Sequence, residues 1–118
     1  MISYETVFLY ALAFTVVVET IILFIAARKI LKIDKIKASN AMLLFLGFFC
    51  SFATIPYLWF VLPEFIKSRV LFTFVGEVSV TIIEGIIYYF VLKIKLRDAM
   101  LISLLCNLAS FTLGLMIF

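Results

Sequence analysis

Three glutamates stand inside long apolar stretches, and their type and spacing could do chemistry. Glu19 falls in the first stretch, whereas Glu77 and Glu84 both fall in the third. The last two are seven residues apart, so on a helix they share one face, about 10.5 Å apart along the axis. An acidic side chain in the middle of a membrane costs on the order of 2.5–3.5 kcal/mol on the insertion scale. That cost favours a functional role over a packing role for all three.

The apolar stretches contain no basic residue that could neutralise these glutamates. Each carboxyl group must therefore be protonated, bound to a cation, or wetted by a cavity. The chain has no His and only two Cys. Oxygen donors without imidazole or thiolate clusters favour protons or hard cations over zinc or copper. We therefore expect no cofactor other than a proton or a hard cation.

Polar and small residues follow one face of every apolar stretch when about 100° is turned per residue. Glu19, Glu84 and Asn107 also lie at one depth, each eight residues from the charged end of its stretch. The sequence thus predicts one polar layer built by all four stretches, with Glu77 as a second acidic position further out. The predicted ion, proton or substrate site consists of Glu19, Glu77, Glu84, Asn107, Ser51, Thr54 and Ser110.

Four membrane-spanning helices must position these residues. Of the 118 residues, 67% are hydrophobic and 14% are charged, against about 45–50% and about 25% in soluble domains. So apolar a chain must have lipid as its solvent, and each stretch is close to the roughly 20 residues that cross a bilayer. We predict an all-α membrane protein, a four-helix bundle in one domain, with spans over about 6–27, 41–62, 70–92 and 99–118.

The basic residues predict how these spans are oriented. The connections at 28–40 and 93–98 hold eight of the ten Lys and Arg residues. The positive-inside rule places such connections in the cytoplasm, so both termini are expected outside a cell membrane. The net charge of +3 follows from this topology, and we expect no nucleic-acid partner.

Two pairs of similar segments indicate an internal duplication. Residues 18–22 (VETII) resemble 83–87 (IEGII), and residues 50–54 (CSFAT) resemble 106–110 (CNLAS). The first and third spans run in the same direction, so the interpretation is a parallel repeat of two helical hairpins about an axis along the membrane normal. That rotation would bring Glu19 onto Glu84 and Ser51 onto Asn107.

Three functions stay open at this stage. Proton- or hard-cation-coupled transport or conduction is favoured, because acids that line a passage explain their presence in a membrane. Glu19 and Glu84 would form an inner site and Glu77 an outer relay, in a homo-oligomer because four helices leave little room for a wide path. The alternative is a non-catalytic assembly subunit or scaffold, in a homo-oligomer or a larger membrane complex, whose protonated glutamates join helices. An intramembrane lipid enzyme is disfavoured, since no His and no nucleophile–base motif accompany the carboxyl groups.

Overall fold

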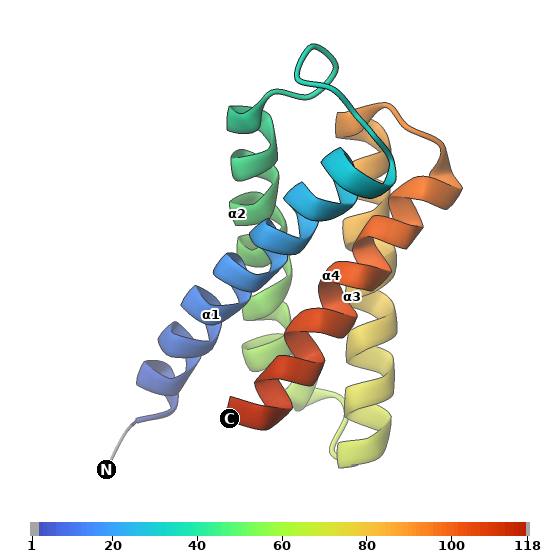
Figure 1. Cartoon of the computed structure of the whole chain (residues 1–118). Helices are drawn as coiled ribbons and strands as arrows, with labels where there is room; N and C mark the ends of the chain where they lie inside the picture. The colour runs from blue at the N-terminus through green and yellow to red at the C-terminus, as the bar shows by residue number, and fades with distance from the viewer. Residues whose placement is uncertain (1–2, 118) are drawn as a thin grey trace.

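The computed structural model describes residues 3–117 and contains four long helices (Figure 1). Helix α1 (Tyr4–Ile25) continues into a π-helical turn, η1 (Ala26–Ile30). Helix α2 (Asn40–Pro56) continues through a second π-helical turn, η2 (Tyr57–Val61), and a 3₁₀ turn, η3 (Leu62–Glu64). Helices α3 (Arg69–Leu92) and α4 (Leu96–Ile117) complete the bundle. All four are long and apolar enough to cross a membrane, which confirms the predicted four-helix bundle.

The helices extend past the predicted spans at several ends. The first helical segment runs to Ile30 and α4 begins at Leu96, whereas the predicted boundaries were near 27 and 99. Charged residues such as Arg28 and Arg97 are helical although they lie outside the apolar stretches. Hydropathy marks the edge of the hydrocarbon, and the backbone hydrogen bonds of a helix can continue beyond it. The predicted end of the fourth span, at Phe118, lies outside the described residues.

Serine caps start three of the four helices. The hydroxyls of Ser3, Ser39 and Ser68 accept hydrogen bonds from backbone N–H groups in the first turns of α1, α2 and α3. Each cap satisfies one of the amide groups that a helix N-terminus leaves without a partner, and it fixes where the helix begins. At the other end of α3, Lys93 adopts a left-handed conformation, with φ of 55°, that stops the helix.

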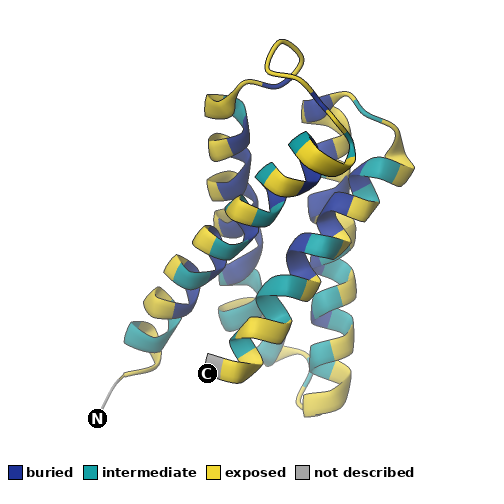
Figure 2. Cartoon of the chain, in the orientation of Figure 1, coloured by how far each residue is buried: buried dark blue, intermediate teal, exposed yellow. Residues whose placement is uncertain are grey.

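The helices pack as a ring in which each contacts its neighbours. Helix α3 lies along α4, α1 packs against both α2 and α4, and α2 touches α3 more lightly. Buried residues face the inside of the bundle and exposed ones face outward along the length of each helix (Figure 2). The outward-facing residues include Phe45, Phe74 and Phe90, as expected of a surface that lipid covers.

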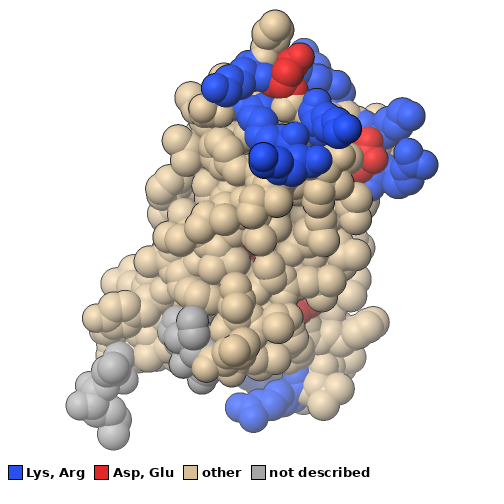
Figure 3. All heavy atoms as spheres, in the orientation of Figure 1, with Lys and Arg blue, Asp and Glu red and all other residues tan. Residues whose placement is uncertain are grey.

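The basic residues of connections 28–40 and 93–98 gather at one end of the bundle (Figure 3). Arg28 organises the first connection, because its guanidinium donates hydrogen bonds to the backbone carbonyls of Ile33 and Ala38 and to the side chain of Asn40. The beginning of α1 and the end of α4 lie at the opposite end of the bundle (Figure 1). Connections 28–40 and 93–98 therefore share one side, as the topology requires.

Candidate functional site

The carboxyl groups of Glu19 and Glu84 meet inside the bundle. They come from α1 and α3, which face each other diagonally across the ring of helices. The two residues are only 2% and 0% exposed, and their carboxyl groups are close enough to interact electrostatically. The prediction that these two glutamates share one layer is consistent with this placement.

The other two helices supply the polar partners of Glu84. The Thr54 hydroxyl of α2 is 2.7 Å from Glu84 Oε2, and the Asn107 amide of α4 donates to Glu84 Oε1 at 3.0 Å. The second N–H of the same amide is available to the backbone carbonyl of Ser103, 2.8 Å away. The amide thus ties Glu84 to α4, while Thr54 ties it to α2.

Glu19 has fewer partners than Glu84. The Ser110 hydroxyl of α4 is 2.9 Å from Glu19 Oε2. Its second carboxyl oxygen, Oε1, is buried and has no hydrogen-bond partner among residues 3–117. The Cys106 thiol is 3.5 Å from the backbone carbonyl of Glu19, so α4 contacts this residue through both its side chain and its main chain.

Ser51 is a predicted site residue without a hydrogen-bond partner in the described chain. It is fully buried on α2, but within the described chain its hydroxyl forms no hydrogen bond with either glutamate or with any other group. The hydroxyl of Tyr88, one turn beyond Glu84 on α3, is likewise buried without a hydrogen-bond partner in that range. These two orphaned hydroxyls leave the inner site with polar atoms that the described chain does not satisfy.

Glu77 occupies different surroundings two turns along α3. It is half-buried, and within residues 3–117 it forms no hydrogen bond or ion pair. It lines a cavity of about 230 Å³ together with Glu19, Thr15, Asn107 and other residues. Glu77 and one member of the inner pair, Glu19, therefore line the same cavity.

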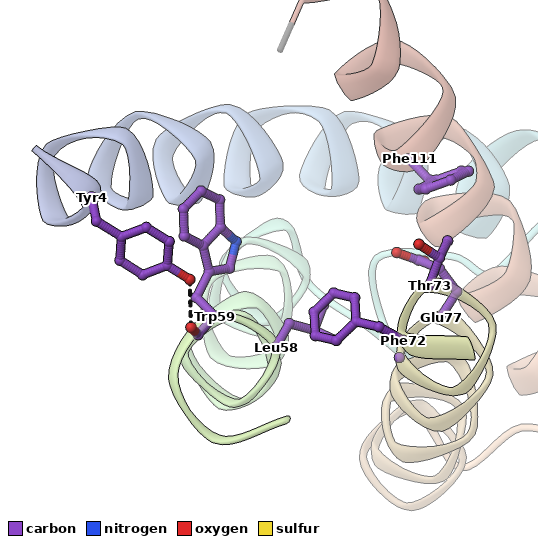
Figure 4. Close-up of a pocket in the computed structure, with 8 residues that line it drawn as sticks. Tyr4, Leu58, Trp59, Phe72, Thr73, Glu77 and Phe111 are labelled. Carbon is purple, nitrogen blue, oxygen red and sulfur yellow. Dashed lines mark hydrogen bonds between the residues drawn. The ribbon is translucent and has the colours of Figure 1, made fainter. Parts of the chain in front are cut away.

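A second cavity of about 360 Å³ adjoins Glu77 on the outer side (Figure 4). Figure 4 shows Glu77 and Thr73 of α3 directed toward Phe111 of α4, with Tyr4 and Trp59 as the facing wall. The Tyr4 hydroxyl donates to the backbone carbonyl of Trp59 at 2.6 Å, and their ring centroids are 5.1 Å apart. This wall joins the start of α1 to η2.

The position of Trp59 depends on Pro56. A proline has no N–H to donate to the carbonyl four residues earlier, so the α-helical hydrogen-bond ladder is interrupted there. Helix α2 ends at Pro56 and the π-helical turn η2 carries Trp59. The extra residue in such a turn rotates the side chains that follow it.

The chain matches no protein-family model, no curated protein and no solved structure. Its function is therefore inferred from the chemistry of the site. A hard cation at the inner pair would find carboxyl oxygens from Glu19 and Glu84 and the amide oxygen of Asn107 as possible ligands. Within residues 3–117, His, Cys, Asp and Glu do not gather in groups of three or more that could hold a metal ion.

Two groups of residues at the site were not predicted from the sequence. One is the pair Tyr88 and Cys106: Tyr88 is buried one turn beyond Glu84, and the Cys106 thiol contacts the backbone carbonyl of Glu19. The other is the aromatic lining of the outer cavity, formed by Tyr4, Trp59, Phe72 and Phe111. The only signal for Tyr88 was its position on the polar face of α3, and the four aromatic residues gave no common signal because they come from four separate segments.

Proposed function

We propose that this protein carries out proton-coupled transport or conduction, with Glu19 and Glu84 as the inner proton-binding pair. The observation that supports this most is the number of protons in the hydrogen-bond network. Thr54 Oγ1 is 2.7 Å from both Glu84 Oε2 and the carbonyl of Cys50. Ser110 Oγ is 2.9 Å from Glu19 Oε2 and 3.2 Å from the carbonyl of Asn107.

Each of these hydroxyls has one proton for two neighbouring acceptors. When the carboxylate is ionised, the hydroxyl can satisfy only one of the two oxygens. A proton on the carboxyl group completes the arrangement, because Glu84 then donates to Thr54 while Thr54 donates to the carbonyl of Cys50. The same holds for Glu19 and Ser110.

The surroundings of the glutamate pair support a proton path that is more open on one side of the pair than on the other. Toward the outer end, the cavity of about 230 Å³ reaches from Glu19 to Glu77, which would serve as the outer relay. Toward the basic connections, the bundle is filled by fully buried apolar side chains. These are Leu23, Leu43, Leu46, Leu92 and Ile102. Opening and closing of this apolar cluster would control access from that side.

The proposed orientation places connections 28–40 and 93–98 in the cytoplasm and both termini outside. The asymmetry of basic residues between the two ends of the bundle supports it (Figure 3). A cysteine at Ser68 should react with an impermeant thiol reagent applied from outside, whereas one at Lys35 should not. The reverse labelling pattern would contradict the orientation.

The proposed duplication is supported by a pair of equivalent hydrogen bonds. The two matched segments relate Glu19 to Glu84 and Thr54 to Ser110. The bond from Thr54 to Glu84 and the bond from Ser110 to Glu19 are therefore counterparts, each linking one hairpin to the other. A parallel repeat about the membrane normal produces this relation.

A non-catalytic assembly role is the second candidate, and the same bonds favour it. Thr54, Asn107 and Ser110 all reach a glutamate on another helix, as polar side chains do when they join membrane helices. In this role the glutamates stay protonated and never exchange their protons. The homo-oligomer expected from the sequence stays a prediction, to be checked by native mass spectrometry of the solubilised protein.

Transport and assembly predict different results when Glu19 or Glu84 can no longer ionise. Glu84→Gln and Glu19→Gln keep the size of the side chain and most of its hydrogen bonding but cannot lose a proton. In proteoliposomes under an imposed pH gradient, transport predicts proton flux in the wild type and flux at least about tenfold lower in both variants, equivalent to about 1.4 kcal/mol in the barrier. Glu64→Gln, at an exposed position of η3, is the matched control and should keep wild-type flux.

Thermal unfolding in detergent shows whether each variant is folded before its flux is measured. A wild-type protein that moves no proton, sodium, magnesium or calcium ion under a gradient would leave assembly as the better interpretation. Wild-type flux in the Gln variants would remove Glu19 and Glu84 from the mechanism.

A further inference from the structure

We infer that the outer cavity binds an organic ammonium cation, with the Glu77 carboxylate as counter-charge and aromatic rings as walls. The binding site stands on its own geometry, and only the role of this cation as a transport substrate rests on the proposed function. The cavity contains about 360 Å³ and lies at the end of the bundle away from the basic connections. That volume falls within the range of small-molecule sites in proteins.

The charge of the site calls for a cation. Glu77 has no hydrogen-bond or ion-pair partner in the described chain, and no Lys or Arg lines the cavity. An ionised carboxylate that is partly removed from water is unfavourable unless a positive charge accompanies it. A bound cation would therefore supply the counter-charge to Glu77 that the described residues do not provide.

The lining distinguishes an organic cation from a metal ion. Glu77 and Thr73 are two of only three lining residues with a side-chain oxygen, and the third, Tyr4, already donates its hydroxyl proton to Trp59. Calcium and magnesium take six or more oxygen ligands, so water would have to supply most of them in a cavity whose other walls are apolar. An ammonium group with alkyl substituents needs one counter-charge and apolar walls, and both are present here.

The walls carry aromatic rings from four elements. Tyr4, Trp59, Phe72 and Phe111 come from α1, η2, α3 and α4. Cations are attracted to the faces of aromatic rings, with Trp as the strongest partner. Trp59 is also held in place, since its carbonyl accepts from Tyr4 and its ring centroid lies 5.8 Å from that of Phe8. A wall fixed before binding loses little side-chain freedom when the ligand enters.

The single Trp of the chain makes binding measurable in the purified full-length protein. Tetraethylammonium, benzyltrimethylammonium and choline are titrated while Trp59 emission is recorded, with a Trp59→Phe variant as the blank. The uncharged isostere of choline, 3,3-dimethylbutan-1-ol, is titrated in parallel. We expect a saturable change with at least one of the cations. We also expect choline to bind at least about tenfold more tightly than its isostere.

Matched variants test the two parts of the site. Glu77→Gln should weaken binding at least about tenfold, whereas Glu64→Gln, exposed in η3, should leave it unchanged. Phe111→Leu should weaken binding about two- to fivefold through the lost ring, whereas Phe90→Leu, 69% exposed on α3, should have no effect. Thermal unfolding establishes whether each variant is folded. If Glu77→Gln does not fold, Phe111→Leu still tests the site.

The inference is overturned if none of the three cations gives a saturable change, or if the isostere binds as well as choline. Unchanged binding in folded Glu77→Gln would also overturn it. The outcome is independent of flux: cation binding by a protein that moves no ion contradicts only the proposed function, whereas proton flux without cation binding contradicts only this inference.

Discussion

Glu84 and Glu77 lie two turns apart on the same helix, but their surroundings are opposite. Glu84 is fully buried and receives hydrogen bonds from α2 and α4. Glu77 is half-buried, has no such partner in the described chain, and faces cavities with aromatic walls. Helix α3 presents both carboxyl groups in the same way, so the contrast originates in the helices packed around it.

Small residues make the inner level tight. A Cβ atom added at Gly47 would collide with the side chain of Thr20, and one added at Gly85 would collide with Met100. Gly47 therefore lets α2 approach α1, and Gly85 lets α3 approach α4 across the interface where the Asn107 amide reaches Glu84. At the outer level, aromatic rings and the π-helical turn after Pro56 hold the helices around open space. The comparison shows that one acidic residue type can be enclosed by polar partners or left facing a cavity, according to how closely its neighbours pack.

The largest expected difference between the two levels is chemical reactivity. Dicyclohexylcarbodiimide, an apolar reagent for carboxyl groups, should modify Glu77 at least about tenfold faster than Glu19 or Glu84. The inner pair can react only after a local opening, and each factor of ten corresponds to about 1.4 kcal/mol of opening free energy. Mass spectrometry of digested protein measures the modification at each glutamate. Equal rates at Glu77 and Glu84 would show that the two levels do not differ in access.

A smaller difference is expected from one substitution made at both levels. Thr54→Val removes the hydroxyl that contacts Glu84, and it should lower the free energy of unfolding by about 0.6 kcal/mol and at most about 1.7 kcal/mol. Thr73→Val on the outer cavity should change it by less than about 0.5 kcal/mol, because Thr73 has no hydrogen-bond partner in the described chain. Unfolding in mixed micelles gives both values. The contrast fails if Thr73→Val is the more destabilising of the two.

The smallest expected effect concerns the duplication. Ser110→Ala removes the counterpart of the Thr54 hydroxyl and should lower the free energy of unfolding by about 0.6 kcal/mol or less, since Ser110 is only half-buried. Thr112→Ala, at an exposed position of α4, is the control. A Ser110→Ala protein as stable as the control would indicate that the two hydrogen bonds are not equivalent.

Helical periodicity explains how much of the inner site could be predicted from the sequence. It fixes which residues share a face, and counting from the charged ends fixes their depth, so Glu19, Glu84 and Asn107 were expected in one layer. Hydrogen-bond partners depend on the rotation of each helix about its own axis. The rotation of α2 places the Thr54 hydroxyl within hydrogen-bond distance of Glu84. It leaves the Ser51 hydroxyl, three residues earlier, without a hydrogen-bond partner in the described chain.

The outer cavity could not be predicted in the same way. Its lining comes from four segments, and the direction of Trp59 depends on a π-helical turn that breaks the regular period. A pattern based on about 3.6 residues per turn no longer predicts which face a residue lies on after Pro56. The aromatic residues there resemble those that anchor any helix at the membrane interface.

The two counterpart hydrogen bonds have a consequence for the direction of proton movement. The two bonds correspond, but the two glutamates are not equivalent, because the Asn107 amide donates to Glu84 alone and Glu19 Oε1 has no partner among residues 3–117. Exchange of a proton between the two carboxyl groups does not by itself move it toward either side of the membrane. Any direction must then come from the unequal ends of the path, where Glu77 and its cavity stand on one side and the cluster around Leu23, Leu46 and Ile102 on the other. In the proposed function the glutamate pair would act as a reversible exchange point, and the gradient across the membrane would determine which way protons leave it.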